Sequence, residues 1–245
     1  MFSHIEISPY FIIPTYLLFL SALYCALVLW TAKKAESKNY PVKDSLDLGF
    51  AIMIGGFLGA RLLHVFFENP EYYKADWKKI LYVWEGGFVF FGGAFGALIA
   101  SLVILKIKKI SFAIWADFFA PIFALGYGVG RLSCLLAGCC YGRSTHLPWS
   151  IEGRHPTQLY AVFFELLVFA FLVAYEKRKL QKFSGEIFVI WIFLHGVGRL
   201  MMELFRDDFR GSQILSLSIS TWIAILLILI SSSIYALKRL SKVSS

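Results

Sequence analysis

The chain has 245 residues, of which 58% are hydrophobic and only 16% are charged, and its mean hydropathy is +0.68. Soluble domains carry about 25% charged residues, so this composition excludes an ordinary soluble domain and indicates a membrane protein. The net charge of +8 does not indicate nucleic-acid binding, because the basic residues fall in short clusters between apolar runs, as is typical of segments that flank membrane spans.

Seven apolar runs are long enough to cross a bilayer as helices, which takes about 20 residues each. They cover residues 10–30, 48–67, 86–105, 110–137, 159–175, 187–205 and 213–237. The N-terminus has no lysine or arginine before the first run, so we expect a retained span and no cleavable signal peptide. Without a soluble domain, a linker or a repeat, the sequence predicts an all-α polytopic membrane protein, one domain over residues 1–245.

Basic residues predict the orientation of these spans. The loops after the first, third and fifth spans and the C-terminal tail hold fourteen lysines and arginines, and the remaining loops hold seven. Basic loops prefer the cytoplasmic side, so we expect the N-terminus outside and the C-terminus in the cytoplasm.

Glycines recur at four-residue spacing inside three predicted spans, and such pairs let helices approach closely. The pairs are Gly55/Gly59, Gly92/Gly96 and Gly126/Gly130. We interpret most of them as packing positions rather than binding positions.

Three arginines lie inside predicted spans, and the expected topology brings them to one depth in the outer half of the membrane. They are Arg61, Arg131 and Arg199, and Tyr16 and Gln158 are expected at the same level. An arginine in hydrocarbon costs about 2.5–3.5 kcal/mol or more, so three at one level favour a function. Guanidinium recognises phosphate bidentately, which predicts a phospholipid site. The alternative is that each arginine snorkels or pairs with an acid, as Arg199 can with Glu203 one turn away.

Three of the four cysteines lie close together at the end of the fourth predicted span. Cys134, Cys139 and Cys140 are spaced i, i+5, i+6. This spacing lacks the paired C-x-x-C or nearby histidine of a tetrahedral metal site, so we expect no metal. Packing or a structural disulfide is favoured over a metal ligand or a nucleophile.

Five stretches, in chain order, resemble the motifs of the bacterial prolipoprotein diacylglyceryl transferases. They read GARLLHVFF (59–67), WEGGFVFFGG (84–93), GVGRLSCLLAGCCYGR (128–143), RHPTQLY (154–160) and HGVGRLMMELFR (195–206). The resemblance covers nearly the whole chain, including its length and its seven spans.

The resemblance implies an enzyme of the bacterial inner membrane. Such an enzyme moves the diacylglyceryl group of phosphatidylglycerol onto the lipobox cysteine thiol of a prolipoprotein and releases glycerol 1-phosphate, the first step of lipoprotein maturation. We expect no cofactor. The arginines central to lipid binding and catalysis in the family correspond to Arg131 and Arg199. Further matching positions are Gly142, expected at the phospholipid site, and the motif residues Gly92, Gly93, Arg154 and His155.

The sequence departs from the family pattern at groups that handle protons. The histidine before Gly-Gly is Phe91, the Gly-Asn pair is Ser133-Cys134, and a tyrosine of the later span is His195. Phenylalanine cannot take a proton, and a thiol is a weaker hydrogen-bonding group than an amide. These departures are compatible with a variant transferase that has a relocated base, a relative with another acceptor or donor, or an inactive relative.

If the chain is a transferase, Arg131 and Arg199 stabilise the charge on the departing phosphate, and Glu203 orients Arg199. Glu165 is expected to do similar work in the fifth span. His195, one turn before Arg199, is the first candidate for the base that takes the thiol proton, and His155 is the second. A transporter would carry charges reachable from both sides or a two-fold repeat, and a non-enzymatic scaffold would transfer no lipid.

Overall fold

In the computed structural model, the described residues are 4–8, 11–83, 86–207, 213–215 and 217–243. Long α-helices dominate, and the chain divides into two compact units, each described by itself. The first unit comprises Met1–Leu27 and Ala113–Ser245, and the second comprises Val28–Phe112.

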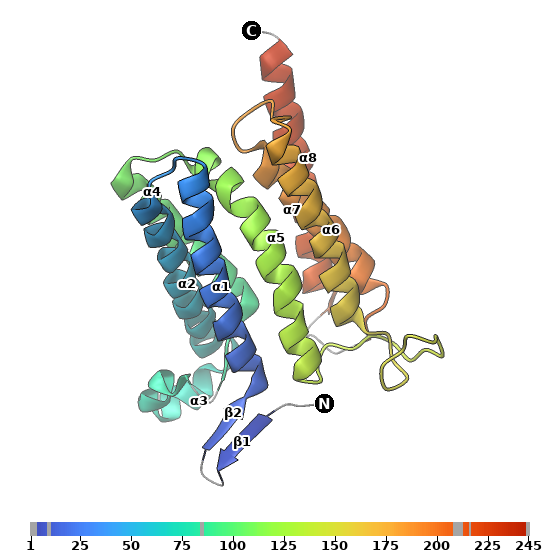
Figure 1. Ribbon diagram of the computed structural model, residues 1–245. Coiled ribbons are helices and arrows are strands. Elements are labelled where there is room, and N and C mark those ends of the chain that lie inside the picture. The colour runs from blue at the N-terminus through green and yellow to red at the C-terminus, as the bar shows by residue number, and fades with distance from the viewer. Residues whose placement is uncertain (1–3, 9–10, 84–85, 208–212, 216, 244–245) are drawn as a thin grey trace. The chain divides into compact units, whose positions relative to one another are not determined.

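The first unit contains four long helices and the beginning of another (Figure 1). Its elements are β1 (His4–Ser8), β2 (Phe11–Pro14), the start of α1 (Thr15–Ser37), α5 (Phe112–Leu136), α6 (Thr157–Lys177), α7 (Glu186–Glu203), β3 (Gln213–Ile214), β4 (Leu217–Ser218) and α8 (Ile219–Val243). β1 pairs with β2 and β3 with β4, both antiparallel.

The core of the first unit lies where α5, α6 and α7 meet. It is built from Ala120 and Ala124 of α5, Val168 and Leu172 of α6, and Ile187 of α7, all of them buried. The small alanines allow the larger side chains of the neighbouring helices to reach into the interface, as is usual where membrane helices pack closely.

Asp117 of α5 caps the beginning of α7. Its Oδ2 accepts a hydrogen bond from the Gly185 amide at 2.6 Å, and its Oδ1 accepts one from the Phe188 amide at 3.0 Å. The first amides of a helix lack partners within the helix, and a carboxylate at that end also complements the helix dipole. One acid within a predicted span is therefore explained by the start of another helix.

The second unit contains the end of α1, two further long helices and a connecting region (Figure 1). Its elements are α2 (Val42–Leu63), the π-helical turn η1 (His64–Glu68), α3 (Pro70–Ala75), the 3-10 turn η2 (Trp77–Leu81) and α4 (Phe90–Lys108).

Glycines form the contact between α2 and α4. A Cβ added to Gly59 would lie 2.3 Å from the Gly92 carbonyl oxygen, and one added to Gly96 would lie 2.2 Å from the Gly55 carbonyl oxygen. Only glycine fits at these points, because the backbones touch. The packing role predicted for these two glycine pairs is confirmed.

The predicted all-α membrane architecture is confirmed, although α1, α2, α4 and α8 begin four to six residues away from the predicted starts. Among the described residues, six helices are long and apolar enough to cross a membrane. The 18-residue α7, which contains Glu186, Arg199 and Glu203, is not one of them, so the seventh span stays a prediction. The first span begins at Thr15 rather than residue 10, because 11–14 pair as a strand. The last span begins at Ile219 rather than residue 213. The Ser218 hydroxyl caps this helix, α8, by accepting a hydrogen bond from the Thr221 amide at 3.2 Å. Apolar composition alone does not separate such strands from a helix.

Candidate functional site

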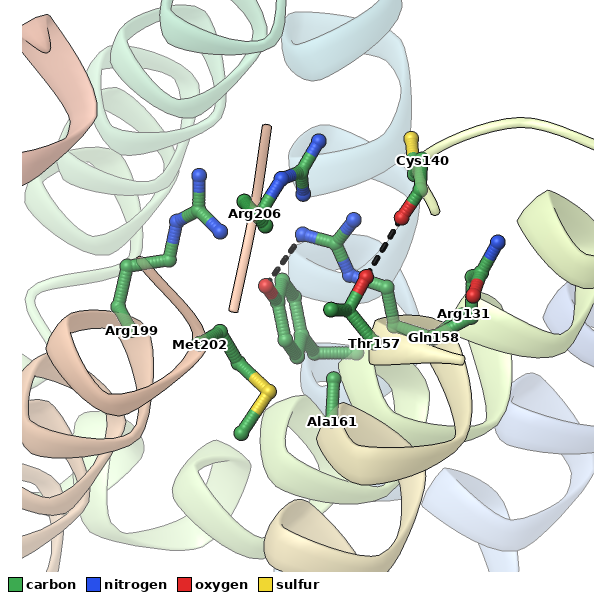
Figure 2. A pocket seen from close by; sticks show the side chains of 9 residues that line it. Arg131, Cys140, Thr157, Gln158, Ala161, Arg199, Met202 and Arg206 are labelled. Carbon is green, nitrogen blue, oxygen red and sulfur yellow. Dashed lines mark hydrogen bonds between the residues drawn. The ribbon is translucent and has the colours of Figure 1, made fainter. Parts of the chain in front are cut away.

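Three arginines surround one cavity in the first unit (Figure 2). Arg131 comes from α5, Arg199 from α7, and Arg206 from the segment that follows α7. The cavity is narrow, and its walls also include Tyr127, Cys140, Thr157, Gln158, Ala161 and Met202. The site therefore combines a concentration of positive charge with a small polar chamber.

This cavity is called here the arginine pocket, and the contacts of two of its arginines are as follows. The Arg131 guanidinium donates to the Tyr127 hydroxyl and lies 4.7 Å from the centre of its ring. Glu203 is 4.0 Å from Arg199, the outer limit of an ion pair, and accepts a hydrogen bond from Ser218 at 2.7 Å. No carboxylate is present among the described residues that line the pocket. Such a chamber attracts an anion.

Gln158 is buried at the wall of the arginine pocket with one polar atom unsatisfied. The side chain is only 1% exposed, and its Nε2 donates to the Cys139 carbonyl. Its Oε1 has no partner among the described residues. A buried acceptor without a partner costs about 1–3 kcal/mol, so this oxygen is suited to a ligand that brings a hydroxyl or amide donor.

The loop between α5 and α6 folds back against the end of α7. The Gly142 amide donates to the His155 carbonyl at 2.8 Å, and the Arg143 amide donates to the Phe205 carbonyl at 2.7 Å. A Cβ on Gly142 would lie 2.3 Å from the Phe205 carbonyl oxygen, so this close approach requires glycine. The loop thereby holds the backbone beside Arg206, with which Gly142 forms a bridge.

Two motif residues of this loop, Arg154 and His155, lie outside the lining of the arginine pocket. His155 Nδ1 is 3.0 Å from the Tyr160 hydroxyl, and its ring packs against Phe205 with centroids 5.2 Å apart. Arg154 is exposed and pairs with Ser144 through its backbone. The positions of both residues indicate that they shape the loop.

A second cavity adjoins the arginine pocket and shares Tyr127, Ala161, Arg199 and Met202 with it. Its lining also contains His195 and Glu165, whose Nδ1 and Oε1 atoms are 2.5 Å apart. Glu165 is 2% exposed, and its Oε2 has no hydrogen-bond partner among the described residues.

Tyr127 stands between the two cavities. Its ring meets the His195 ring edge-on with centroids 4.5 Å apart, while its hydroxyl accepts from Arg131. The imidazole of His195 and the guanidinium of Arg131 are thus separated by a single side chain.

The thiols of Cys134, Cys139 and Cys140 meet beside the arginine pocket, and Cys140 also lines it. Hydrogen bonds with Cys134 and Cys139 hold the pKa of the Cys140 thiol below its usual range, and Arg206 and Arg131 act in the same direction. A hydrogen bond with Cys134 raises the pKa of the Cys139 thiol.

Tyr16, predicted at the phospholipid site, is 37% exposed near the start of α1. Its hydroxyl interacts electrostatically with Cys134, Cys139 and Arg131 but does not line the arginine pocket. A direct contact between Tyr16 and lipid stays a prediction.

Arg61 belongs to the second unit, where its guanidinium is committed to backbone carbonyls. Nε donates to Ile80 at 3.1 Å, one terminal nitrogen donates to Lys79 at 2.8 Å, and the other donates to Gly87 at 3.2 Å. Carbonyls of Tyr82 and Gly86 also accept from it. With its donors occupied, this buried arginine holds the loop before α4, and its predicted contact with phospholipid stays untested.

The other motif positions of the second unit lie at the start of α4. Gly92 and Gly93 face the backbone of α2, where a Cβ would lie 2.4 Å from the Gly59 oxygen and 3.2 Å from the Gly56 oxygen, respectively. Phe91 packs against Phe90. The first two residues of this motif, 84 and 85, lie outside the described residues.

Three polar lining residues were not singled out from the sequence: Arg206, Tyr127 and Thr157. Arg206 closes the motif that contains Arg199, seven residues or about two helical turns later, and that spacing was the available signal. Tyr127 precedes Arg131 by one turn of α5, so its place beside the guanidinium follows from helix geometry. No sequence pattern around Thr157 indicated its place at the pocket, because that place depends on how the loop between α5 and α6 folds back.

Comparison with known proteins places these features in a family context. The family described as prolipoprotein diacylglyceryl transferase matches residues 4–237. A phosphatidylglycerol–prolipoprotein diacylglyceryl transferase of Bordetella parapertussis is 33% identical over 225 residues, covering 87% of this chain and 85% of its own. The protein of that name from Clostridium tetani is 32% identical over 228 residues, covering 89% and 90%. The one from Geobacter sulfurreducens is 37% identical over 172 residues, covering 67% and 65%.

Proposed function

Because this chain belongs to the prolipoprotein diacylglyceryl transferase family, we propose that it transfers the diacylglyceryl group of phosphatidylglycerol to a prolipoprotein. The acceptor is the lipobox cysteine thiol, and glycerol 1-phosphate is released. The observation that carries the proposal is the arginine pocket, in which three guanidinium groups surround one chamber without a lining carboxylate among the described residues.

The arginine pocket is suited to the phosphate of the lipid headgroup. Phosphatidylglycerol carries one negative charge on a phosphodiester, and Arg131, Arg199 and Arg206 offer planar donors that bind phosphate oxygens in pairs. The unpaired Oε1 of Gln158 accepts a hydrogen bond from a hydroxyl of the headgroup glycerol. The acyl chains remain outside this small chamber, among the lipids.

Transfer is a displacement at carbon. The acceptor sulfur attacks the glyceride carbon that carries the phosphate ester, so a C–S bond forms as the C–O bond breaks. The electron pair of the broken bond leaves on glycerol 1-phosphate. Arg131 and Arg199 stabilise that developing charge, and groups placed in this way typically contribute about 10²–10³ in rate each.

The proton of the acceptor thiol goes to His195. Glu165 keeps a proton on Nδ1 of the ring, which leaves Nε2 as the basic nitrogen. Free thiols have a pKa near 8.5, so at neutral pH a base is needed to raise the fraction of thiolate. This assignment gives a proton acceptor to a chain that has Phe91 where the family motif has histidine.

We propose that the enzyme lies in the bacterial inner membrane, with the arginine pocket towards the outer leaflet. Support comes from α6, which begins at Thr157 beside the pocket and ends at Lys177, about 30 Å away at 1.5 Å per residue. The segment after Lys177 contains Arg178, Lys179 and Lys182, and such basic segments stay in the cytoplasm. A reporter fused to the C-terminus is then expected to be active only inside the cell.

Transfer is tested with purified full-length protein, phosphatidylglycerol labelled in its acyl chains, and a synthetic peptide that carries a lipobox cysteine. Mass spectrometry is expected to find a diacylglyceryl thioether on the cysteine, and glycerol 1-phosphate is expected in equal amount. Arg131→Ala abolishes transfer, whereas Arg178→Ala, a change at an exposed position, leaves it unchanged.

Two results would contradict the proposal. Near-normal turnover by a correctly inserted Arg131→Ala variant would remove the phosphate-binding assignment. Lipid consumption with no thioether, but with another labelled acceptor in total membranes, would identify a transferase for a different acceptor. A peptide with serine in place of cysteine serves as the matched substrate control.

A further inference from the structure

The three cysteines beside the arginine pocket form a compact sulfur cluster. The sulfur atoms of Cys134, Cys139 and Cys140 all lie within 4.8 Å of one another. Cys134 belongs to the last turn of α5, and the other two follow in the loop. The three are free thiols, as is Cys25, which lies apart on α1 and is exposed.

The backbone after α5 is built so that these sulfurs meet. Gly138 has a φ of +70°, and the Cys139 amide donates to the Cys134 carbonyl at 3.1 Å, which turns the chain back over the end of the helix. The Cys139 side chain therefore returns to Cys134, although five residues separate them. The i, i+5, i+6 spacing of the cysteines predicted no metal site, because spacing alone does not show that the chain turns back at Gly138.

Cys140 is held in an uncommon conformation. Its φ of +66° lies in the left-handed region, which non-glycine residues seldom adopt. Thr157 donates to the Cys140 carbonyl at 2.6 Å, and Gln158 donates to the Cys139 carbonyl (Figure 2 shows the first of these bonds). Two side chains at the start of α6 thus fix the backbone of both loop cysteines and offset the strain at Cys140.

We propose that Cys134, Cys139 and Cys140 form a binding site for a thiophilic divalent ion, with Zn²⁺ as the reference case. Zinc–sulfur bonds of about 2.3 Å around one ion require sulfur–sulfur distances of about 4 Å, which the cluster reaches with sub-ångström shifts. A disulfide would join only two of the sulfurs, at about 2.05 Å, and leave the third without a role. Three protein ligands leave a fourth position for water or an external ligand.

Binding is an exchange of protons for metal. One Zn²⁺ replaces the three thiol protons, and the resulting site has a net charge of −1. The positive charges of Arg131 and Arg206, which interact electrostatically with Cys140, offset that charge. Cys139 is exposed, so the ion has a route of entry. The proposal does not depend on lipid transfer, because binding can be measured in the absence of any substrate.

The test uses full-length protein in detergent, reduced and stripped of metal with EDTA. Titration with Cd²⁺ is followed by the ultraviolet absorption of cadmium–thiolate bonds, and Zn²⁺ then competes. We expect saturation at one Cd²⁺ per chain. Because loss of an outer-shell partner already costs 10- to 100-fold in affinity, each of Cys134→Ser, Cys139→Ser and Cys140→Ser should weaken binding by at least about 100-fold. Cys25→Ser is the matched control and should bind as the parent does.

Three results would overturn the proposal. Affinity unchanged in all three cluster variants would show that the absorption arises elsewhere. Loss of binding in Cys25→Ser would assign the ligand to α1. A disulfide within the cluster in protein isolated from membranes without reductant, together with less than 0.1 equivalent or so of zinc by elemental analysis, would replace the metal site with a redox pair. Thermal unfolding with and without Zn²⁺ reports that each serine variant is folded.

Discussion

His195 of α7 and Glu165 of α6 lie with Nδ1 and Oε1 2.5 Å apart, and the second oxygen of Glu165 has no hydrogen-bond partner among the described residues. Burying a carboxylate is costly unless it is paired, and His195 is the hydrogen-bonding partner of Glu165. The pair thus provides an oriented histidine one turn from Arg199.

Replacing Glu165 with glutamine tests this orientation. The amide keeps the volume but no longer fixes the proton on Nδ1, so we expect transfer to fall about 10- to 100-fold, less than the 10²–10⁴ typical of losing a general base itself. Phospholipid binding should stay unchanged. Glu152→Gln, in an exposed loop position, is the control. An unaltered transfer rate in Glu165→Gln would remove this pair from the transfer step.

Arg206 is predicted to bind lipid although it lies outside every helix. Lysine keeps the charge but loses the planar pair of donors, so Arg206→Lys should raise KM for phosphatidylglycerol about tenfold, and Arg206→Gln about 100-fold, as expected for charge-assisted hydrogen bonds of roughly 1.5–3 kcal/mol. Initial rates at varied lipid concentration measure both values. Arg178→Gln controls for a general loss of positive charge. Equal KM values for all variants would remove Arg206 from the lipid site.

The contact between α2 and α4 predicts a contrast between two glycines on one helix. A Cβ on Gly59 would lie 2.3 Å from the Gly92 oxygen, whereas one on Gly56 would have its nearest neighbour at 3.6 Å. Gly59→Ala should therefore lower the free energy of unfolding by about 1–3 kcal/mol, as overpacking does, while Gly56→Ala should be nearly neutral. Thermal unfolding in detergent compares them. Equal melting temperatures would contradict the close approach.

Arg61 is predicted to hold the loop that precedes α4. It donates to carbonyls between Lys79 and Gly87 from three nitrogens, an arrangement that the single ammonium of lysine cannot reproduce. Arg61→Lys should make the loop open more often, and trypsin should cleave after Lys78 and Lys79 several-fold faster. Arg154→Lys, a conservative change in the first unit, is the control. An unchanged cleavage rate would favour a different role for Arg61, including contact with lipid.

Much of the fold could be predicted from the sequence because apolar runs near 20 residues have few alternatives in a membrane. The glycine pairs of α2 and α4 were correctly predicted as packing positions, since four-residue spacing places them on one face. The starts of α1 and α8 were wrong, because short apolar strands in hairpins have the same composition as the ends of spanning helices.

The site was predicted in part. Arg131 and Arg199 could be identified as partners because alternate spans bring similar positions to one level, and both line the arginine pocket. The position of Arg61 in the sequence could not reveal that its donors bind carbonyls of the loop before α4. The path of that loop is not determined by the residues next to Arg61. The meeting of three thiols likewise depends on left-handed backbone at Gly138 and Cys140, which sequence spacing does not predict.

The cap that Asp117 places on α7 links two helices made at different times. The capped amide of Gly185 lies 68 residues later in the chain. At about 5–20 residues per second, α5 waits roughly 3–14 seconds before its carboxylate acquires those donors. Until then Asp117 is a carboxylate without these partners, and its transfer into lipid is costly. We therefore expect α5 to leave the translocation machinery together with α7 rather than before it.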